Sequence, residues 1–151
     1  MLRVSVLASS SKGNSTFVEM DGVRLLIDAG ISAKRIVSGL GELGVEPDSL
    51  DGVLITHEHI DHVKGLSVLA KRYRLPVFSR AATIEAICSK NEIPRECLHA
   101  VGKGASFGSA YVETFNISHD AAEPVGFKIY GSHKCTFATD LGFVSESVQE
   151  R

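Results

Sequence analysis

The sequence predicts a layered α/β fold in a single domain, residues 1–151. Strand and helix patterns alternate from the start of the chain to about residue 94, and strand patterns alone follow them. Neither internal repeats nor linkers interrupt this order. Alternating strands and helices are typical of folds in which helices cover a sheet. A length of 151 residues suits one domain, because domains commonly have about 100–200 residues.

The N-terminal part is expected to begin with strands and to continue with a helix. Asp21-Gly22 is a two-residue hairpin signal between two apolar runs. Ser32 can cap a helix whose apolar residues recur at helical spacing. The expected elements are strands at 2–8, 16–20 and 23–27, a loop of turn residues at 9–15, and a helix from 32 to about 43.

The middle of the chain contains a short continuous apolar run, 52–56, which is typical of a buried strand. This run leads directly into a histidine-rich segment, His57–His62. The later elements that we expect are helices at 63–73 and 83–89, and strands at 76–78, 99–101, 110–117, 126–130 and 134–139.

The composition excludes several classes of protein. With 44% hydrophobic and 23% charged residues, the chain has the balance of a globular protein and not of a disordered chain or a coiled coil. No apolar run reaches the roughly 18 residues that a membrane-spanning helix needs, so no membrane partner is expected. The net charge of −2 does not by itself indicate a nucleic-acid partner. The three cysteines form no C-x-x-C pair, which argues against a disulfide framework and favours a cytoplasmic location.

The segment His57-Glu58-His59-Ile60-Asp61-His62 is the strongest functional signal. In extended backbone, the side chains of residues 57, 59 and 61 project to one side, and His62 begins the expected helix. Imidazole and carboxylate groups could thus converge, and this set of ligands suits zinc, iron and manganese. The alternative is a chance cluster on a polar loop. Three histidines and an aspartate within six residues favour the metal site.

One loop cannot surround a metal ion, so further ligands must come from distant parts of the chain. His119 follows the apolar run 112–117, and Asp140 follows the run 135–139. Both lie where a strand is expected to end, as His57 does. Each residue alone would more often be an ordinary loop residue, but beside the segment 57–62 a ligand role is favoured.

Several motifs resemble those of one protein family. Thr56-His57-Glu58-His59-Ile60-Asp61-His62 resembles the metal motif of the metallo-β-lactamase superfamily. Ile27-Asp28-Ala29-Gly30 before it and Phe137-Ala138-Thr139-Asp140-Leu141-Gly142 after it resemble further landmarks of that superfamily, in the same order. Residues 9–15 and 118–127 look more specifically like the WalJ/YycJ-type branch of exonuclease-like phosphodiesterases. The resemblance covers nearly the whole chain.

The resemblance implies an αββα four-layer sandwich with a site for two divalent metal ions, zinc or else manganese or iron. Carried over by position, the first ion is held by His57, His59 and His119, the second by Asp61 and His62, and Asp140 bridges them. The superfamily also uses a later histidine on the second ion, but this chain has no histidine after Asp140. The resemblance therefore also implies that the second half of the sandwich is incomplete, with a C-terminal strand and helix missing.

Through the contexts Ser118-His119-Asp120 and Thr139-Asp140-Leu141-Gly142, the resemblance implies a metal-dependent hydrolase, most directly a phosphodiesterase or nuclease acting on nucleic acid. The chemistry of the expected ligands fits this function. A metal-bound water ionises near neutral pH and supplies hydroxide. Two ions roughly 3.5–4 Å apart can stabilise an in-line displacement at phosphorus. Asp61, which lies within the loop, is the candidate general base.

Two alternatives to this function remain at the level of sequence. A thioester or lactam hydrolase of the same fold is the first, although Ser118-His119-Asp120 differs from the Gly-His-Thr/Ser context usual in those branches. The second is a catalytically impaired metal-binding fragment. An unpaired edge strand in such a fragment could be covered in a homodimer.

Other polar residues near these motifs have two interpretations each. Asp28 either accepts an N–H from a ligand histidine or caps Gly30. Asp120, next to His119, has the same two interpretations. The polar segment 9–15, with Lys12, either contacts a phosphate or is an ordinary loop.

The remaining histidines, cysteines and basic residues are expected to be structural. His99 and His133 are expected at the surface or in local hydrogen bonds. Cys88 and Cys135 are expected in the core as small apolar residues. A solvated helix face is favoured over a basic rim beside the site for five residues, Lys64, Lys71, Arg72, Arg74 and Arg80.

Overall fold

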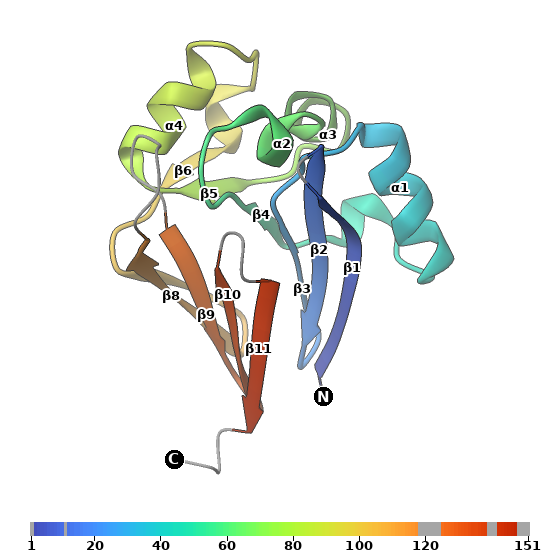
Figure 1. Ribbon diagram of the computed structural model, residues 1–151, viewed down its shortest axis with the longest axis vertical. Coiled ribbons are helices and arrows are strands. Elements are labelled where there is room, and N and C mark those ends of the chain that lie inside the picture. Colours follow the sequence, from blue (N-terminus) through green and yellow to red (C-terminus); the bar gives the residue numbers. More distant parts are fainter. Residues whose placement is uncertain (1, 11, 118–124, 139–141, 148–151) are drawn as a thin grey trace.

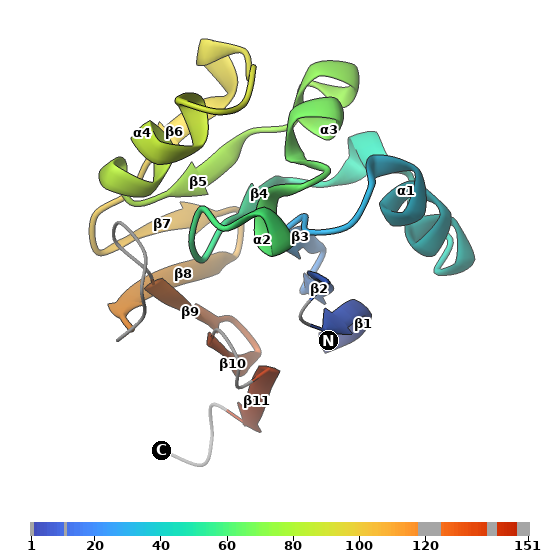
Figure 2. The same cartoon turned by 45° about the horizontal axis from the view of Figure 1, so that its top comes forward.

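The computed structural model describes residues 2–10, 12–117, 125–138 and 142–147, and it does not describe side chains from 138 onward. The described residues form two β-sheets and four α-helices (Figure 1). The sheets face each other, and the helices lie on the outer side of the first sheet (Figures 1 and 2). The predicted layered α/β class is confirmed.

The first sheet has six strands in the order β1-β2-β3-β4-β5-β6. Its strands are β1 Leu2–Ser10, β2 Gly13–Met20, β3 Val23–Ile27, β4 Gly52–Leu54, β5 Val77–Ser79 and β6 Leu98–Ala100. The pairs β1–β2 and β2–β3 are antiparallel, whereas β3, β4, β5 and β6 run parallel. The carboxyl ends of the parallel strands therefore meet at one edge of the sheet, and β2 begins at that edge because Thr16 pairs with Ile27.

The second sheet is antiparallel, with the strand order β11-β10-β9-β8-β7. Its strands are β7 Gly104–Phe107, β8 Ala110–Asn116, β9 Val125–Tyr130, β10 His133–Ala138 and β11 Gly142–Ser147. Along β8 the side chains alternate: Ala110, Val112 and Thr114 are buried, and Tyr111 is 43% exposed. This period of two buries one face of the strand.

Two apolar cores hold the layers together. Between the sheets, residues such as Leu25 and Leu54 pack with Phe127 and Ile129 of the second sheet. On the other side of the first sheet, a second core is formed with the helices α1 Ala33–Glu42, α3 Leu66–Tyr73 and α4 Ala81–Cys88. In the part of the chain that the structure describes, no helix covers the outer face of the second sheet. The described layers are thus helix, sheet and sheet.

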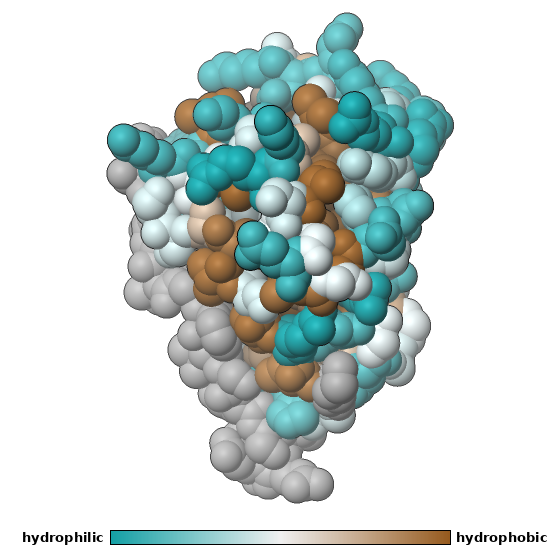
Figure 3. Space-filling view, turned by 90° about the vertical axis from the view of Figure 1, so that its right-hand side faces the viewer, coloured by the Kyte–Doolittle hydropathy of each residue, from teal (hydrophilic) through white to brown (hydrophobic). Residues whose placement is uncertain are grey.

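Strand β1 forms one edge of the first sheet and leaves apolar surface exposed. Figure 3 shows the face that carries β1 and α1, where apolar side chains lie between polar ones. Val6 is 51% exposed there, and Leu7 and Val37 are partly buried against the helix-side core. None of the described helices is long and apolar enough to cross a membrane.

The helix expected after the histidine segment is in fact two helices. A short helix, α2 Ile60–Val63, begins three residues earlier than expected, and α3 begins at Leu66. The N–H of Gly65 donates to the oxygen of Ala29 and so takes part in a tertiary contact at the break. The helix at 33–42 agrees with prediction, since Ser32 accepts a hydrogen bond from the N–H of Arg35.

Two other expectations about local structure were wrong, and two strands were not predicted. The expected loop 9–15 is mostly strand, because Ser10 pairs with Gly13 and only a tight turn separates β1 from β2. Strands β7 and β11 were not predicted, and their short sequences contain glycine and serine. Cys88 is exposed at the last position of α4, whose buried residues are Thr83 and Ile87. Cys135 is buried, as expected.

Candidate metal site

The histidine segment lies where β4 ends and α2 begins. His57 and His59 occupy the connection between these elements, and Asp61 and His62 lie on α2. This connection is at the edge where the carboxyl ends of the parallel strands meet. Ile55, just before it, is buried and donates its N–H to the oxygen of Phe78 on β5. The sheet therefore fixes the start of the segment.

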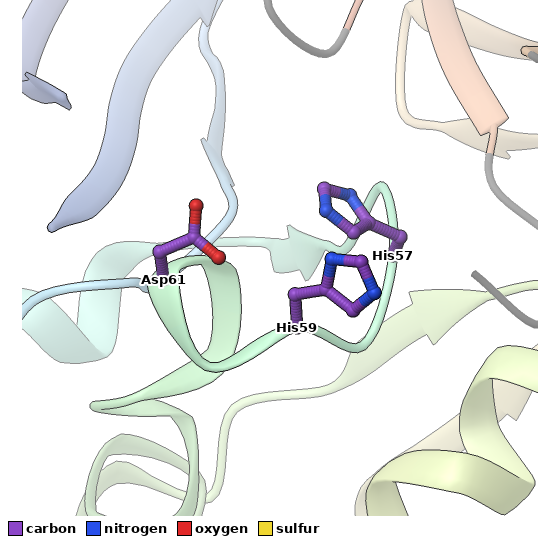
Figure 4. Close-up of side chains that lie close together, drawn as sticks. All are labelled: His57, His59 and Asp61. Carbon is purple, nitrogen blue, oxygen red and sulfur yellow. The ribbon is translucent and has the colours of Figure 1, made fainter. Parts of the chain in front are cut away.

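Three of the predicted ligands come together. Their ligand atoms, one each from His57, His59 and Asp61, all lie within 4.8 Å of one another. Figure 4 shows the two imidazoles side by side and the carboxylate of Asp61 directed toward them from α2. The backbone is extended only as far as His59, so Asp61 reaches the group from a helix and not from the extended chain that the sequence suggested.

Thr56 sets the orientation of the His57 ring. The Thr56 hydroxyl donates its proton to Oδ2 of Asp28 at 2.8 Å. The hydroxyl oxygen of Thr56 is therefore an acceptor toward Nδ1 of His57, which lies 3.0 Å away. Nδ1 of His57 then carries the proton, and the lone pair is on Nε2. His57 is 1% exposed, so this orientation is fixed by burial as well as by the hydrogen bond.

Asp28 sets the orientation of His62. Nδ1 of His62 lies 2.7 Å from Oδ2 of Asp28, and both side chains are about 5% exposed. Nε2 of His62 lies 3.4 Å from Oδ2 of Asp61. A carboxylate that accepts the proton of one ring nitrogen fixes the tautomer and makes the other nitrogen more basic. Of the two interpretations of Asp28, acceptance of a histidine N–H is the one that the structure shows.

The backbone around Asp28 is itself strongly constrained. Its φ is +64°, a left-handed conformation that aspartate tolerates better than most residues. Its N–H donates to the oxygen of Leu54, and its carbonyl accepts from the hydroxyl of Ser15. Its carboxylate also accepts the N–H of Thr56 at 2.8 Å. Asp28 thus joins β2, β3 and β4 to the histidine segment.

Gly30 allows α2 to pack closely against the end of β3. A Cβ atom on Gly30 would lie 1.8 Å from the carbonyl oxygen of Asp61 and 2.7 Å from the N of Asn14. The N–H of Gly30 donates to the oxygen of Asn14, and the N–H of Ala29 donates to the oxygen of His62. Only a residue without a side chain fits at this crossing of three backbone segments.

Asn14 is a site residue that the sequence did not reveal. Its Nδ2 lies 3.3 Å from the carbonyl oxygen of Asp61, and 3.4 Å from both Oδ2 of Asp61 and Nε2 of His62. Asn14 belongs to the polar segment that was expected to be a loop. The sequence signals concerned the segment 9–15 as a whole, its polar character and its resemblance to the WalJ/YycJ-type branch, and they did not single out Asn14. The pairing of β1 with β2 is what places Asn14 beside α2.

The other predicted ligands, His119 and Asp140, lie outside the described residues, as does Asp120. The flanking strands are described. The N–H of Val125, the first residue of β9, donates to the oxygen of Thr56 at 2.9 Å. The second sheet therefore contacts the chain directly beside His57.

His99 and His133, which were expected to be structural, lie away from this group. The exposed ring of His99 stacks on Phe78 at 5.0 Å between centroids. His133 lies 3.1 Å from the hydroxyl of Ser132 through its Nδ1. Both placements agree with the expected local, surface roles.

Two of the five basic residues form exposed ion pairs: Lys71 with Glu92 at 3.2 Å, and Arg74 with Glu96. Arg80 donates to the Thr114 hydroxyl. The exposed ion pairs of Lys71 and Arg74 agree with the favoured solvated helix face, whereas Arg80 precedes α4 and contacts β8.

The donor set fits a divalent metal ion. The rings of His57 and His59 have centroids 4.6 Å apart, and those of His57 and His62 are 3.9 Å apart. Protonated imidazoles at such distances would repel one another, whereas a cation shared between neutral imidazoles and a carboxylate satisfies them together. Imidazole with carboxylate oxygen is a ligand set that zinc, iron and manganese accept.

The fold and the histidine segment together define a protein with the metallo-β-lactamase fold. The family model described as the beta-lactamase superfamily domain matches residues 23–151, and the chain belongs to this superfamily. Among solved structures, the metallo-β-lactamase fold protein YhfI from Bacillus subtilis aligns with a TM-score of 0.71 and 20% identity over 92% of this chain and 62% of that one. A B3 metallo-β-lactamase with an active-site glutamic acid aligns with a TM-score of 0.74 and 16% identity over 89% of this chain and 59% of that one. At these identities the likeness concerns the fold.

Curated relatives are more similar in sequence. The chain is 38% identical to a protein named exodeoxyribonuclease YycJ from Bacillus anthracis, over 98% of this chain and 58% of the relative. It is 37% identical to exodeoxyribonuclease WalJ from Streptococcus pneumoniae, over 95% of this chain and 56% of the relative. The chain therefore spans little more than half the length of these relatives. A stretch of 53 residues is 51% identical to anti-Pycsar protein Apyc1 from Saccharibacillus brassicae, covering 35% of this chain and 21% of the relative.

Proposed function

We propose that the protein hydrolyses phosphodiester bonds of nucleic acid with the help of two divalent metal ions, zinc or else manganese or iron. The ligands in this proposal are His57, His59 and His119 for one ion, Asp61 and His62 for the other, and Asp140 between them. The observation that carries the proposal is the convergence of His57, His59 and Asp61 within 4.8 Å. Bound at this group, two divalent ions would supply Lewis acidity toward a phosphoryl oxygen and an acidified water.

The chain's own residues position these ligands. Asp28 holds His62, and Thr56 holds His57, by the hydrogen bonds described above. Residues that hold ligands in this way commonly change metal affinity by about 10- to 100-fold when they are replaced. The two networks share Thr56 and Asp28, so the two imidazoles are oriented as a unit.

Asp61 has the role of general base in this proposal. Its side chain is 28% exposed, in contrast to the 5% of His62, so one carboxylate can face both the ligand group and water. Asn14 lies beside it with Nδ2 3.4 Å from Oδ2. A carboxylate held in this way can accept a proton from an attacking water.

The relatives favour a phosphodiester over a thioester or lactam as substrate. Two of them, similar over 95–98% of this chain, carry the name exodeoxyribonuclease. The structural likeness to β-lactamases concerns the fold alone, and folds of this kind carry several chemistries. Nucleic acid is accordingly the substrate class that we propose.

Hydrolysis of model substrates tests this function. With zinc or manganese added, the protein should release nitrophenol from bis(4-nitrophenyl) phosphate and leave a nitrophenyl thioester intact. Asp61→Asn should lower the phosphodiester rate by at least about 100-fold, the lower range for general base catalysis. The matched control Asp48→Asn, at an exposed residue of the short 3-10 helix Pro47–Ser49, should keep the rate. Turnover of the thioester alone, or an unchanged rate in a metal-replete Asp61→Asn variant, contradicts the proposal.

A further inference from the structure

A cleft of about 900 Å³ opens directly beside the candidate metal site. It is lined by Glu58, His59, Ile60, Asp61, Val63, Lys90 and Asn91. Its volume lies in the upper part of the range for small-molecule sites. His59 and Asp61, two of the proposed metal ligands, therefore also form part of the wall of this cleft.

The two walls of the cleft come from different elements. Residues 58–63 come from the histidine segment and α2, whereas Lys90 and Asn91 come from the turn after α4. Helices α2 and α4 lie at the same end of the molecule (Figures 1 and 2). A group bound between the walls would therefore contact the site on one side and Lys90 on the other.

The turn that carries Lys90 is anchored to the core. The N–H groups of Lys90 and Asn91 and the Nδ2 of Asn91 all donate to the oxygen of Ile87, at 3.1, 2.9 and 2.9 Å. Ile87 is 1% exposed and belongs to the helix-side core. The backbone at Lys90 is thus held in place, while its side chain is exposed.

Lys90 differs from the basic residues nearby, because their charges are paired with carboxylates. Lys71 and Arg74 are paired with Glu92 and Glu96. Within the described residues, no carboxylate lies within 4.0 Å of the ammonium group of Lys90. The carboxylates that line the cleft, Glu58 and Asp61, come from the histidine segment and α2 and not from the turn that carries Lys90. A cation that lines the same cleft as the site is suited to a phosphate that belongs to the same ligand as the reacting group.

The cleft also offers an exposed apolar side chain. Ile60, the first residue of α2, is 67% exposed and lies between the ligands His59 and Asp61. A large apolar side chain in this position can contact the face of a sugar or base, in the place that aromatic residues take in sites for single-stranded nucleic acid.

We infer that this cleft binds the nucleotide next to the bond that is cleaved, with Lys90 contacting its phosphate and Ile60 its base or sugar. This inference rests on the proposed function and extends it, because it makes the substrate a strand of at least two nucleotides. A substrate without a neighbouring nucleotide makes no use of the cleft.

Binding of a fluorescent single-stranded oligonucleotide tests the inference. Anisotropy titrations at several salt concentrations give the dissociation constant and its salt slope for the protein and for Lys90→Ala. The variant should bind more weakly, and its slope should fall by about 0.7, the contribution of one phosphate contact on a single strand. Lys90→Arg should restore the slope. Ile60→Ser should weaken binding and keep the slope, because it removes no charge.

The matched control is Arg72→Ala, which removes the same unit charge from an exposed position in the last turn of α3. It should leave the slope unchanged. Hydrolysis of bis(4-nitrophenyl) phosphate, which has no neighbouring nucleotide, should proceed at the parent rate in Arg72→Ala. If Lys90→Ala binds and responds to salt as Arg72→Ala does, the inference is wrong even where hydrolysis is normal. If instead the parent protein fails to hydrolyse bis(4-nitrophenyl) phosphate, the proposed function is contradicted by that assay alone.

Discussion

Asp28 shows how much of the site depends on one carboxylate. It accepts hydrogen bonds from the N–H and hydroxyl of Thr56 and lies 2.7 Å from Nδ1 of His62. It is 5% exposed, and a buried carboxylate is stable only when its oxygens are paired in this way. The orientation of His62 therefore depends on a residue that the proposal does not count among the ligands.

Replacing Asp28 with asparagine should weaken metal binding while the chain stays folded. The amide keeps the size of the side chain, but its oxygen is a poorer acceptor for the ring proton of His62. Zinc or cobalt affinity, measured by calorimetric titration, should fall by about 10- to 100-fold. Asp48→Asn is the control and should bind as the parent does. Equal affinities in a folded Asp28→Asn variant would show that this contact does not support the metal.

Gly30→Ala should destabilise the protein through a backbone clash. The added Cβ would meet the carbonyl of Asp61 at 1.8 Å, so α2 must shift, at a cost of about 3 kcal/mol or more in the free energy of unfolding. Gly41, in α1, has no atom within 4 Å of an added Cβ. Gly41→Ala should therefore stabilise the helix by about 0.5–1 kcal/mol. Urea unfolding of both variants measures the difference, and effects of the same sign would contradict this account.

At the scale of residues, the sequence predicts ligands better than their supports. His57, His59 and Asp61 follow one another closely, so their chemistry is visible in one short segment, and the structure brings them together. Asn14 and Lys90 reach the site only through strand pairing and helix packing. Contacts of that kind join residues far apart in the chain, and no local pattern marks them.

At the scale of elements, long periodic segments are predictable and short ones are not. Helix α1 follows a capping serine and a regular apolar spacing, and it lies where the sequence places it. The helix expected at 63–73 has a continuous apolar face, yet it divides where Gly65 donates its N–H to Ala29. Strands β7 and β11 depend on pairing with β8 and β10, which local sequence does not reveal.

Helix α3 offers a direct test of the helix-side core. Leu69 is fully buried and its neighbour Val68 is 50% exposed on the same helix. Leu69→Ala should lower the free energy of unfolding by about 2–5 kcal/mol, because it leaves a cavity. Val68→Ala should change it by no more than about 0.5 kcal/mol. Thermal or urea unfolding checks both, and similar losses in the two variants would contradict the orientation of the helix.

At the scale of the molecule, the site follows from the arrangement of the strands. Parallel strands β3 and β4 end at the same edge, where Asp28 and the histidine segment follow them. The second sheet reaches this edge through the hydrogen bond from Val125 to Thr56. Ligands on segments far apart in sequence can therefore meet at this edge. The alternation of strands and helices in the sequence already indicates a sheet of this kind.

The proposed function requires that the segment 57–62, oriented by Thr56 and Asp28, holds divalent metal. Elemental analysis of purified protein, with unbound metal removed by gel filtration, tests it most directly. We expect at least one zinc, manganese or iron per chain in the parent protein and close to none in the double variant His57→Ala/His59→Ala. Circular dichroism confirms that both are folded. A folded double variant that retains as much metal as the parent would contradict the claim.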